Sequence, residues 1–263
     1  MTAPIPDESD PSESAAAGSA LGRSLVLAYG VAIYVFFLGT FLYAAGFVSD
    51  LLVPKGVSDG TPVPLGDALP VDLALLGLFG VQHTIMARPW FKARFARVLP
   101  QAIERSTFVL CTNLILCLTF WQWRPVEGVA WDLGDGLLAT ALHAVSVGGW
   151  LLVLWSTFLI DHFDLFGLRQ VTRHFRRLPH ADPAFVERWI YRVVRHPLML
   201  GFMLAFWATP VMSSSRLLFC AVTTAYVMVG LRIEERTLVH MHGEEYEDYR
   251  RRVPGLIPWK LGR

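Results

Sequence analysis

The sequence predicts an all-α protein: a polytopic membrane bundle of five to six spanning helices, with a helical hairpin as its last region and a C-terminal cytoplasmic helix. Three observations predict this fold. Of the 263 residues, 54% are hydrophobic and 17% are charged, whereas about a quarter of the residues of a soluble domain are charged. The apolar residues form long runs of the length that a bilayer core requires, about 20 residues. The basic residues are concentrated between those runs.

The first 22 residues are rich in Ala, Ser, Pro and acidic side chains, a composition typical of disorder. We expect one membrane domain after them, residues 23–263. Its first four apolar runs predict one span each. These runs cover residues 24–48, 71–87, 106–123 and 137–160.

The fifth apolar region, residues 197–231, is too long for a single crossing and contains no charge except Arg216. Pro210 and the serines at 213–215 lie near its middle. Proline cannot donate the helical hydrogen bond, and clustered serines favour a turn. We therefore expect two shorter helices that fold back on each other as a hairpin.

The positive charges give this topology an orientation. Basic residues crowd the segments 88–105 and 169–195 and the tail after 231, whereas the alternate loops contain only Lys55, Arg124 and Arg216. The positive-inside rule then places the basic segments and both termini in the cytoplasm, with the spans in the inner (plasma) membrane. Because the basic residues form no continuous stripe, we expect membrane lipid and no nucleic acid as a partner. Formation of a homo-oligomer is left open.

No metal site is expected from the sequence. The three cysteines, Cys111, Cys117 and Cys220, all lie inside apolar runs without a CxxC pair, so we interpret them as small core side chains. A haem or metal protein built on the histidines is an alternative interpretation. Their spacing matches no compact ligand motif.

Polar groups from distant parts of the chain are predicted to meet at one membrane depth on the cytoplasmic side. They come from the ends of spans two and four and from both ends of the hairpin: Gln82 and His83; Asp161, His162 and Asp164; Arg195 and His196; Glu234 and Glu235. Each group alone also has a structural interpretation, such as a helix start with proline at its first position or a solvated acidic pair. Ionisable residues at membrane depth are costly and usually functional. Their convergence therefore favours a site.

Four C-terminal motifs, within residues 188–259, resemble a known signature. They read RHPLMLG (195–201), RIEERTL (232–238), HGEEYEDY (242–249) and VPGLIP (253–258). This ordered set is similar to the signature of isoprenylcysteine carboxyl methyltransferases and phospholipid N-methyltransferases. Three upstream motifs resemble the methanethiol S-methyltransferase branch of that superfamily, to which nurim is related. They read QHTIMARPWFK (82–92), IDHFDLFGLRQV (160–171) and FWATP (206–210).

The resemblance implies an integral membrane enzyme that uses S-adenosyl-L-methionine to convert methanethiol, a small volatile thiol, to dimethyl sulfide. It also implies that the cofactor is bound from the cytoplasm by residues of the C-terminal motifs. These are Arg195, His196, Pro197, Leu198, Gly201, Glu234, Glu235, Tyr246 and Tyr249. One position departs from the family: Met199 stands where a tyrosine is common.

The residue types suit the parts of this cofactor. Glu234 or Glu235 suits its ammonium group, and Arg195 or a helix N-terminus suits its carboxylate. Gly201 permits a close approach of the adenosine to the backbone. Tyr246 and Tyr249 are expected to cover the adenine or cap the pocket.

The acceptor requires a base, because a thiolate is the nucleophile and alkyl thiols are mostly protonated at neutral pH. His83 is the leading candidate, since histidine accepts a proton near neutral pH. Asp161 or Asp164 is expected to orient it or to replace it, and His162 is the reserve base.

Two other functions are compatible with parts of the sequence. A carboxyl or amine methyltransferase acting on a lipid-like acceptor needs an open lateral groove, and the aromatic residues Phe79, Trp121, Trp123 and Trp155 favour a closed, small site instead. A non-catalytic membrane protein like nurim shares the Gln-His motif. Such a protein has no need of the glutamate pair or of the two C-terminal tyrosines.

Overall fold

The computed structural model describes residues 19–179 and 189–257. Within these ranges, five helices are long and apolar enough to cross a membrane. They are α2 (Ala20–Ser49), α3 (Leu65–Met86), α5 (Gln101–Gln122), α6 (Leu137–Ile160) and α10 (Ser214–His242). The predicted all-α membrane bundle is confirmed, and so is the hairpin, whose first arm is the short apolar helix α9 (Pro197–Trp207).

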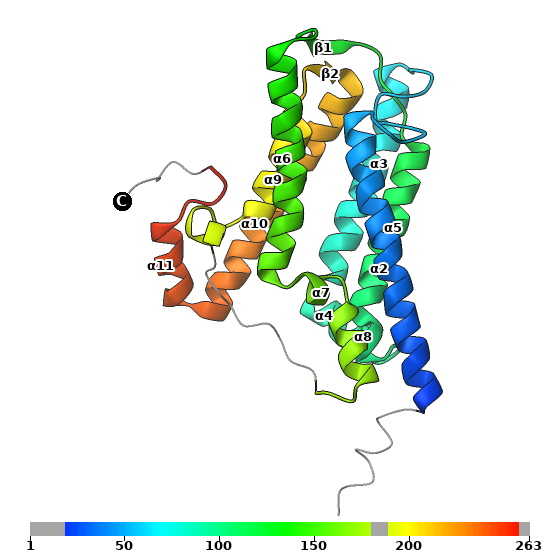
Figure 1. Ribbon diagram of the computed structural model, residues 1–263, viewed down its shortest axis with the longest axis vertical. Helices are drawn as coiled ribbons and strands as arrows, with labels where there is room; N and C mark the ends of the chain where they lie inside the picture. Colours follow the sequence, from blue (N-terminus) through cyan, green and yellow to red (C-terminus); the bar gives the residue numbers. More distant parts are fainter. Residues whose placement is uncertain (1–18, 180–188, 258–263) are drawn as a thin grey trace, which may run out of the picture.

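The helices stand side by side along the long axis of the molecule (Figure 1). Helix α5 packs against α2 and α3, α6 lies along α9, and α10 contacts both α3 and α9. The short helices α4 (Pro89–Phe95), α7 (His162–Leu165) and α8 (Leu168–Phe175) lie at the lower end in Figure 1. Helix α11 (Glu244–Arg252) lies beside the lower half of the bundle.

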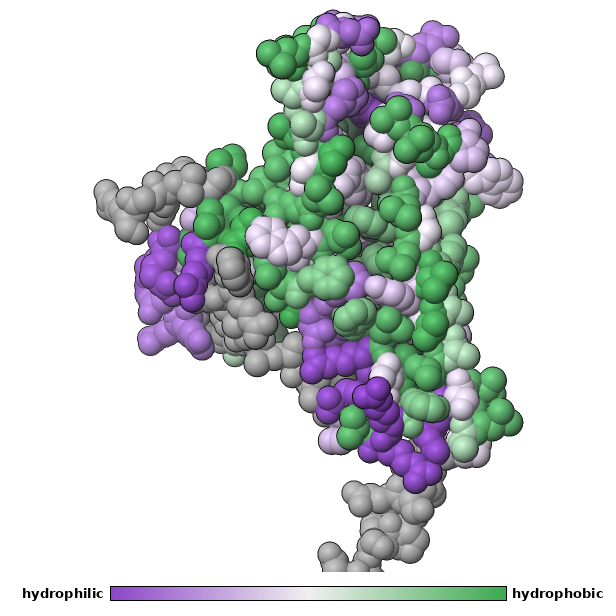
Figure 2. Space-filling model, viewed as in Figure 1, coloured by the Kyte–Doolittle hydropathy of each residue, from purple (hydrophilic) through white to green (hydrophobic). Residues whose placement is uncertain are grey.

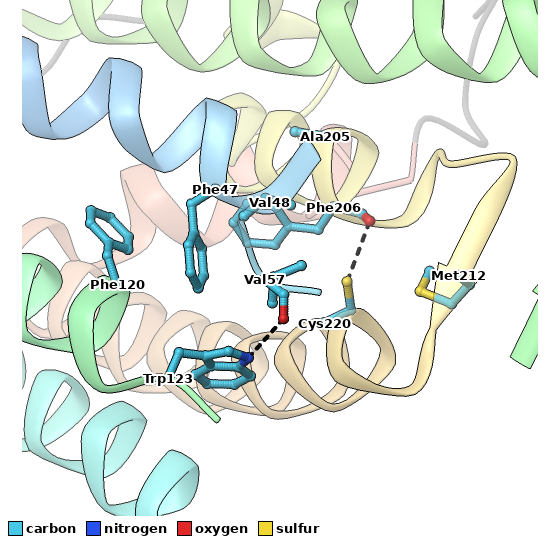
Figure 3. Close-up of a cluster of buried hydrophobic side chains, with 9 residues drawn as sticks. All are labelled: Phe47, Val48, Val57, Phe120, Trp123, Ala205, Phe206, Met212 and Cys220. Carbon is cyan, nitrogen blue, oxygen red and sulfur yellow. Dashed lines mark hydrogen bonds between the residues drawn. The ribbon is translucent and has the colours of Figure 1, made fainter. Parts of the chain in front are cut away.

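The upper end carries a two-stranded antiparallel sheet that the sequence did not predict. Its strands, β1 (Val129–Asp132) and β2 (Val211–Ser213), pair with Trp131 opposite Met212. Beneath them lies a buried cluster that includes Phe47, Val57 and Trp123, in which the Trp123 indole donates a hydrogen bond to the Val57 carbonyl at 3.1 Å (Figure 3). The upper end is therefore closed by a packed core.

Helices α6 and α9 are in direct backbone contact. A Cβ atom placed on Gly201 would lie 2.8 Å from the carbonyl oxygen of Gly149, and one placed on Gly149 would lie 2.5 Å from the backbone nitrogen of Ala205. Only glycine fits at such a distance. The close approach that Gly201 permits in this structure is therefore to α6.

Three helices, α2, α3 and α5, begin earlier than the apolar runs predicted. Helix α3 starts at Leu65 and contains Pro70; a proline this close to the N-terminus costs one helical hydrogen bond. Helix α5 starts at Gln101, so it includes Arg105, which the sequence analysis had assigned to a basic loop. The predicted N-terminal tail falls mainly on residues 1–18, outside the described ranges, while α2 begins at Ala20 behind the N-cap Ser19.

The flanks of the bundle are apolar. Figure 2 shows hydrophobic side chains over the sides of the helices and hydrophilic ones at both ends and on α11. Leu42 of α2 and Leu151 of α6 are more than half exposed. An exposed apolar belt between polar ends is what lipid contact requires, so the chain is a multi-pass membrane protein.

Candidate active site

Glu235, in the lower half of α10, is the hub of the C-terminal motifs. Its Oε1 atom lies 2.5 Å from Nη2 of Arg195 and 3.2 Å from Nε2 of His196. Its Oε2 atom lies 3.6 Å from Nε of Arg250. Three cationic or polar side chains, two from the start of α9 and one from α11, therefore converge on one carboxylate.

The last described segment holds the start of α9 in place. The backbone N–H groups of Arg195 and His196 donate to the carbonyl groups of Pro254 and Gly255, at 2.9 and 3.1 Å. The Arg195 guanidinium also donates to the Val253 carbonyl at 2.9 Å. The VPG and RHP motifs are thus joined by backbone pairing, with Pro197 at the first helical position as the sequence predicted.

Tyr246 and Tyr249 are both almost fully buried, and they form a cluster with Val253. The Tyr249 hydroxyl donates to the carbonyl of Tyr191 at 2.6 Å. The pKa of Tyr246 is raised to about 12, mainly by burial and to a smaller extent by the charge of Glu235. In this structure both rings are enclosed by protein and fasten α11 to its neighbours.

Glu234 differs from Glu235 in its surroundings. Its side chain is 49% exposed, and its carboxylate is 3.9 Å from Nδ1 of His196. Burial and the charge of Glu234 raise the pKa of the Tyr191 phenol. Glu234 is therefore the member of the pair that a cationic ligand can reach.

A surface cavity of about 350 Å³ opens beside this cluster. Arg195, which is paired with Glu235, is one of its lining residues. The cavity is lined by Arg195, Glu247, Arg250, Arg251, Val253, Pro254 and Gly255.

His83 lies in an aromatic environment near the lower end of α3. Its ring stacks on Phe79 at a centroid distance of 5.4 Å and is tilted against Phe108 of α5 at 5.0 Å. Its Nδ1 atom is buried and has no hydrogen-bond partner among the described residues. The preceding Gln82 accepts a hydrogen bond from Thr112 at 3.3 Å, which ties this turn of α3 to α5.

Arg105 is a charged neighbour of His83 that the sequence did not indicate. Its guanidinium lies over the Phe108 ring, 4.9 Å from the centroid, and its Nε donates to the carbonyl of Leu165 at 2.7 Å. Its charge acts on His83 and interacts with the charge of Asp164. One sequence feature could have indicated this residue: Arg105 lies three residues before Phe108, so both side chains are on one face of the helix.

Asp161 and Asp164 are engaged within the turn that connects α6 to α8. Asp161 caps α7 by accepting from the N–H of Asp164 at 3.1 Å, and it forms an ion pair with Arg169. The Asp164 carboxylate accepts from the side chain of Gln170 at 3.2 Å. Within the described ranges these interactions join both aspartates to residues other than His83, and Arg105 is the link between Asp164 and that histidine.

His162 is buried, and both of its ring nitrogens are occupied. Thr157 donates its hydroxyl hydrogen to the Leu154 carbonyl at 2.6 Å, so its oxygen accepts from Nδ1–H of His162 at 2.7 Å. Nε2 then accepts from the Tyr34 hydroxyl at 2.8 Å. Burial lowers the pKa of His162. The network therefore keeps this imidazole neutral and in one tautomer.

The structure brings the predicted residues together as two groups in the lower half of the molecule. One surrounds Glu235, and the other surrounds His83 and Arg105. Helix α10 connects them, because its Tyr226 packs on Phe79, one turn above His83, at 5.8 Å. No hydrogen bond or ion pair between the two groups is found in the part of the chain that the structure describes.

Of the four aromatic residues that were expected to favour a closed, small site, three do not lie beside His83. Phe79 lies beside His83. Trp121 and Trp155, however, are 72% and 48% exposed on the outside of the bundle, and Trp123 is buried at the upper end. A hydropathy pattern does not report which way a tryptophan on a spanning helix faces.

Comparison with known proteins gives consistent matches. The family model described as "Phospholipid methyltransferase" matches residues 133–245. The chain is 50% identical to "Methanethiol S-methyltransferase 2" of Bradyrhizobium diazoefficiens, over 92% of this chain and 93% of that one. It is 48% identical to "Methanethiol S-methyltransferase" of Mycobacterium tuberculosis, over 90% and 97%. "Nurim" of Sus scrofa is 29% identical over 66% of this chain and 69% of its own length. No solved structure matches.

Proposed function

Because the chain belongs to the methanethiol S-methyltransferase family of membrane methyltransferases, we propose that it transfers a methyl group from S-adenosyl-L-methionine to methanethiol and releases dimethyl sulfide. One observation supports a catalytic site in this chain. A histidine with a buried, unpartnered nitrogen lies among aromatic rings on the same end of the bundle as the glutamate pair.

The residues around Glu235 fit the proposed cofactor. When bound, S-adenosyl-L-methionine supplies a methyl group carried on a sulfonium cation. Glu234 offers a reachable carboxylate for the ammonium group, while Glu235 holds Arg195 and His196 at the start of α9. The adjacent cavity of about 350 Å³ falls within the size range of small-molecule pockets, roughly 300–1,000 Å³. We assign cofactor binding to this group of residues.

His83 is our proposed base for the acceptor thiol. Its free Nδ1 can accept the thiol proton, whereas His162 has both nitrogens engaged. The rings of Phe79 and Phe108 exclude water from the imidazole. A reaction between a thiolate and a sulfonium cation removes charge, so a dry apolar environment favours it over water.

We propose that the lower end of the molecule faces the cytoplasm. The basic segments after α3 and around α8 lie at this end. At the upper end, Lys55 is bound to the carbonyls of Trp121 and Trp123, and Arg216 is paired with Asp50. Because these two cations are bound by groups of the protein itself, they add little to the exposed positive charge of the upper end. The difference in positive charge between the two ends, which orients a membrane protein, is therefore larger.

The test is an acceptor comparison with detergent-purified protein and S-adenosyl-L-methionine. Methanethiol, a longer alkyl thiol and a prenylcysteine are supplied in parallel, and methylated products are measured by gas and liquid chromatography. We expect dimethyl sulfide to form fastest. A methyl ester on the prenylcysteine without dimethyl sulfide would support a carboxyl methyltransferase instead. A folded protein without any methylated product would support a non-catalytic role.

A further inference from the structure

We propose that Arg105 is a catalytic residue that stabilises the thiolate of the acceptor beside His83. The inference rests on the proposed function, and it adds a residue that the C-terminal and upstream motifs do not contain. It is carried by the position of one guanidinium group in the lower half of the bundle.

The placement of Arg105 is unusual for a basic residue of a membrane protein. Positive side chains near helix ends commonly extend to the aqueous interface. Arg105 instead turns toward the bundle, where its Nε is bound to the Leu165 carbonyl and its guanidinium covers the Phe108 ring. This cation is therefore held in place from two sides.

His83 contacts the same ring. The imidazole centroid is 5.0 Å from the Phe108 centroid, and the guanidinium carbon is 4.9 Å from it. One aromatic side chain thus contacts both the proposed base and a fixed cation, and the charge of that cation acts on the imidazole. A small sulfur nucleophile that reaches His83 comes under the influence of the guanidinium charge.

The donors of the guanidinium are only partly used. Within the described residues, Nε has an acceptor, while no hydrogen bond is assigned to the terminal nitrogens. The acidic groups that face Arg105 are Glu104 and Asp164, and they balance its charge when the acceptor is absent. The two terminal nitrogens, which carry the other four N–H donors of the guanidinium, therefore remain for an anionic ligand.

The chemistry of the acceptor requires such a group. The S–H bond of the thiol breaks, its proton goes to His83, and the electron pair stays on sulfur as a thiolate. That sulfur then forms the new S–C bond to the methyl group as the S–C bond of the donor sulfonium breaks. The proton on His83 is finally released to water. A fixed cation stabilises the thiolate before the transfer, and such stabilisation in a dry site is worth more than in water.

The experiment compares two acceptors that differ in acidity. Methanethiol must be ionised in the site, whereas methaneselenol is already largely ionised at neutral pH. We expect Arg105→Gln to lower kcat with methanethiol by about 10²-fold, the usual cost of removing one charge-stabilising donor, and to lower kcat with methaneselenol far less. Cofactor affinity, measured by calorimetry, should stay at the wild-type value.

Equal losses with the two acceptors would overturn the inference, because a purely structural role of Arg105 does not distinguish them. Arg97→Gln, at an exposed arginine on the same end, is the matched control and should leave both rates unchanged. If the Gln variant does not fold, Arg105→Lys carries the test. It keeps the positive charge, so its thiol-to-selenol rate ratio should stay near wild type, and a ratio reduced tenfold or more, about one power of ten, would contradict the proposal. Absence of dimethyl sulfide from the wild type would instead refute the proposed function.

Discussion

Replacing His83 with phenylalanine removes the proposed base and preserves its packing. The imidazole ring stacks on Phe79 at 5.4 Å and contacts Phe108 at 5.0 Å, and a phenyl ring can occupy the same space. A general base contributes about 10²- to 10⁴-fold to a rate. At 1.36 kcal/mol for each factor of ten, this is about 3 to 5 kcal/mol of transition-state stabilisation. We expect kcat of His83→Phe to fall by that factor.

The assay is the initial rate of dimethyl sulfide release into the headspace at saturating cofactor, with cofactor affinity measured separately by calorimetry. His83→Ala is the companion variant, because it removes both the base and the packing. If His83 acts as a base, the two variants lose similar activity and bind the cofactor normally. If His83 only fills space, the Phe variant keeps turnover within about tenfold of wild type, below the range expected for a base, and the mechanism proposed here is refuted.

Three further predictions concern the glutamate pair, the buried histidine and the helix contact. Glu234→Gln should raise the KM for the cofactor without loss of thermal stability. Glu235→Gln should lower the free energy of unfolding by about 3 kcal/mol, because it leaves the largely buried Arg195 guanidinium without its carboxylate partner; equal Tm values for the two variants would contradict this division. Burial lowers the pKa of His162 from its ordinary value of 6.5, so below that pH the unfolded chain takes up a proton more readily than the folded protein does. The free energy of unfolding is therefore unaffected by this histidine above pH 6.5 and decreases as the pH falls below it. Tm measured from pH 7.5 to about 5 should fall less in His162→Gln than in wild type, and parallel curves would refute the assignment. Gly149→Ala should lower stability by about 1 to 3 kcal/mol through overpacking against α9, while Gly148→Ala, which meets nothing within 4 Å, should not; comparable Tm losses in both would argue against backbone contact there.

The sequence predicted helices best where turn-forming residues bound the apolar run. The fourth span, 137–160, agrees with α6 at both ends, between Gly136 and Asp161. The hairpin agrees because Pro197 starts α9 and Ser213 caps α10. Helix α5 was predicted too short, since helical hydrogen bonding continues beyond the apolar run and includes charged residues. The pairing of β1 with β2 joins segments about 80 residues apart and left no local signal.

The sequence predicted which residues lie together at the site better than it predicted how they are arranged. Motif residues of the C-terminal part do lie together, as Arg195, His196 and Glu235 show. The different surroundings of Glu234 and Glu235 could not be foreseen, because neighbouring residues on a helix point about 100° apart and only the packed structure decides which one faces a partner. The partner of His162 is Tyr34, 128 residues away, and no spacing rule indicates it.

The central claim, that this chain moves a methyl group from S-adenosyl-L-methionine to methanethiol, is tested most directly by following the methyl group itself. Purified protein is given cofactor with a trideuterated methyl group and unlabelled methanethiol, and the headspace is analysed by mass spectrometry. We predict dimethyl sulfide with one deuterated and one ordinary methyl group, formed at a rate that depends on His83. Unlabelled dimethyl sulfide, or label found only in a lipid fraction, would contradict the account.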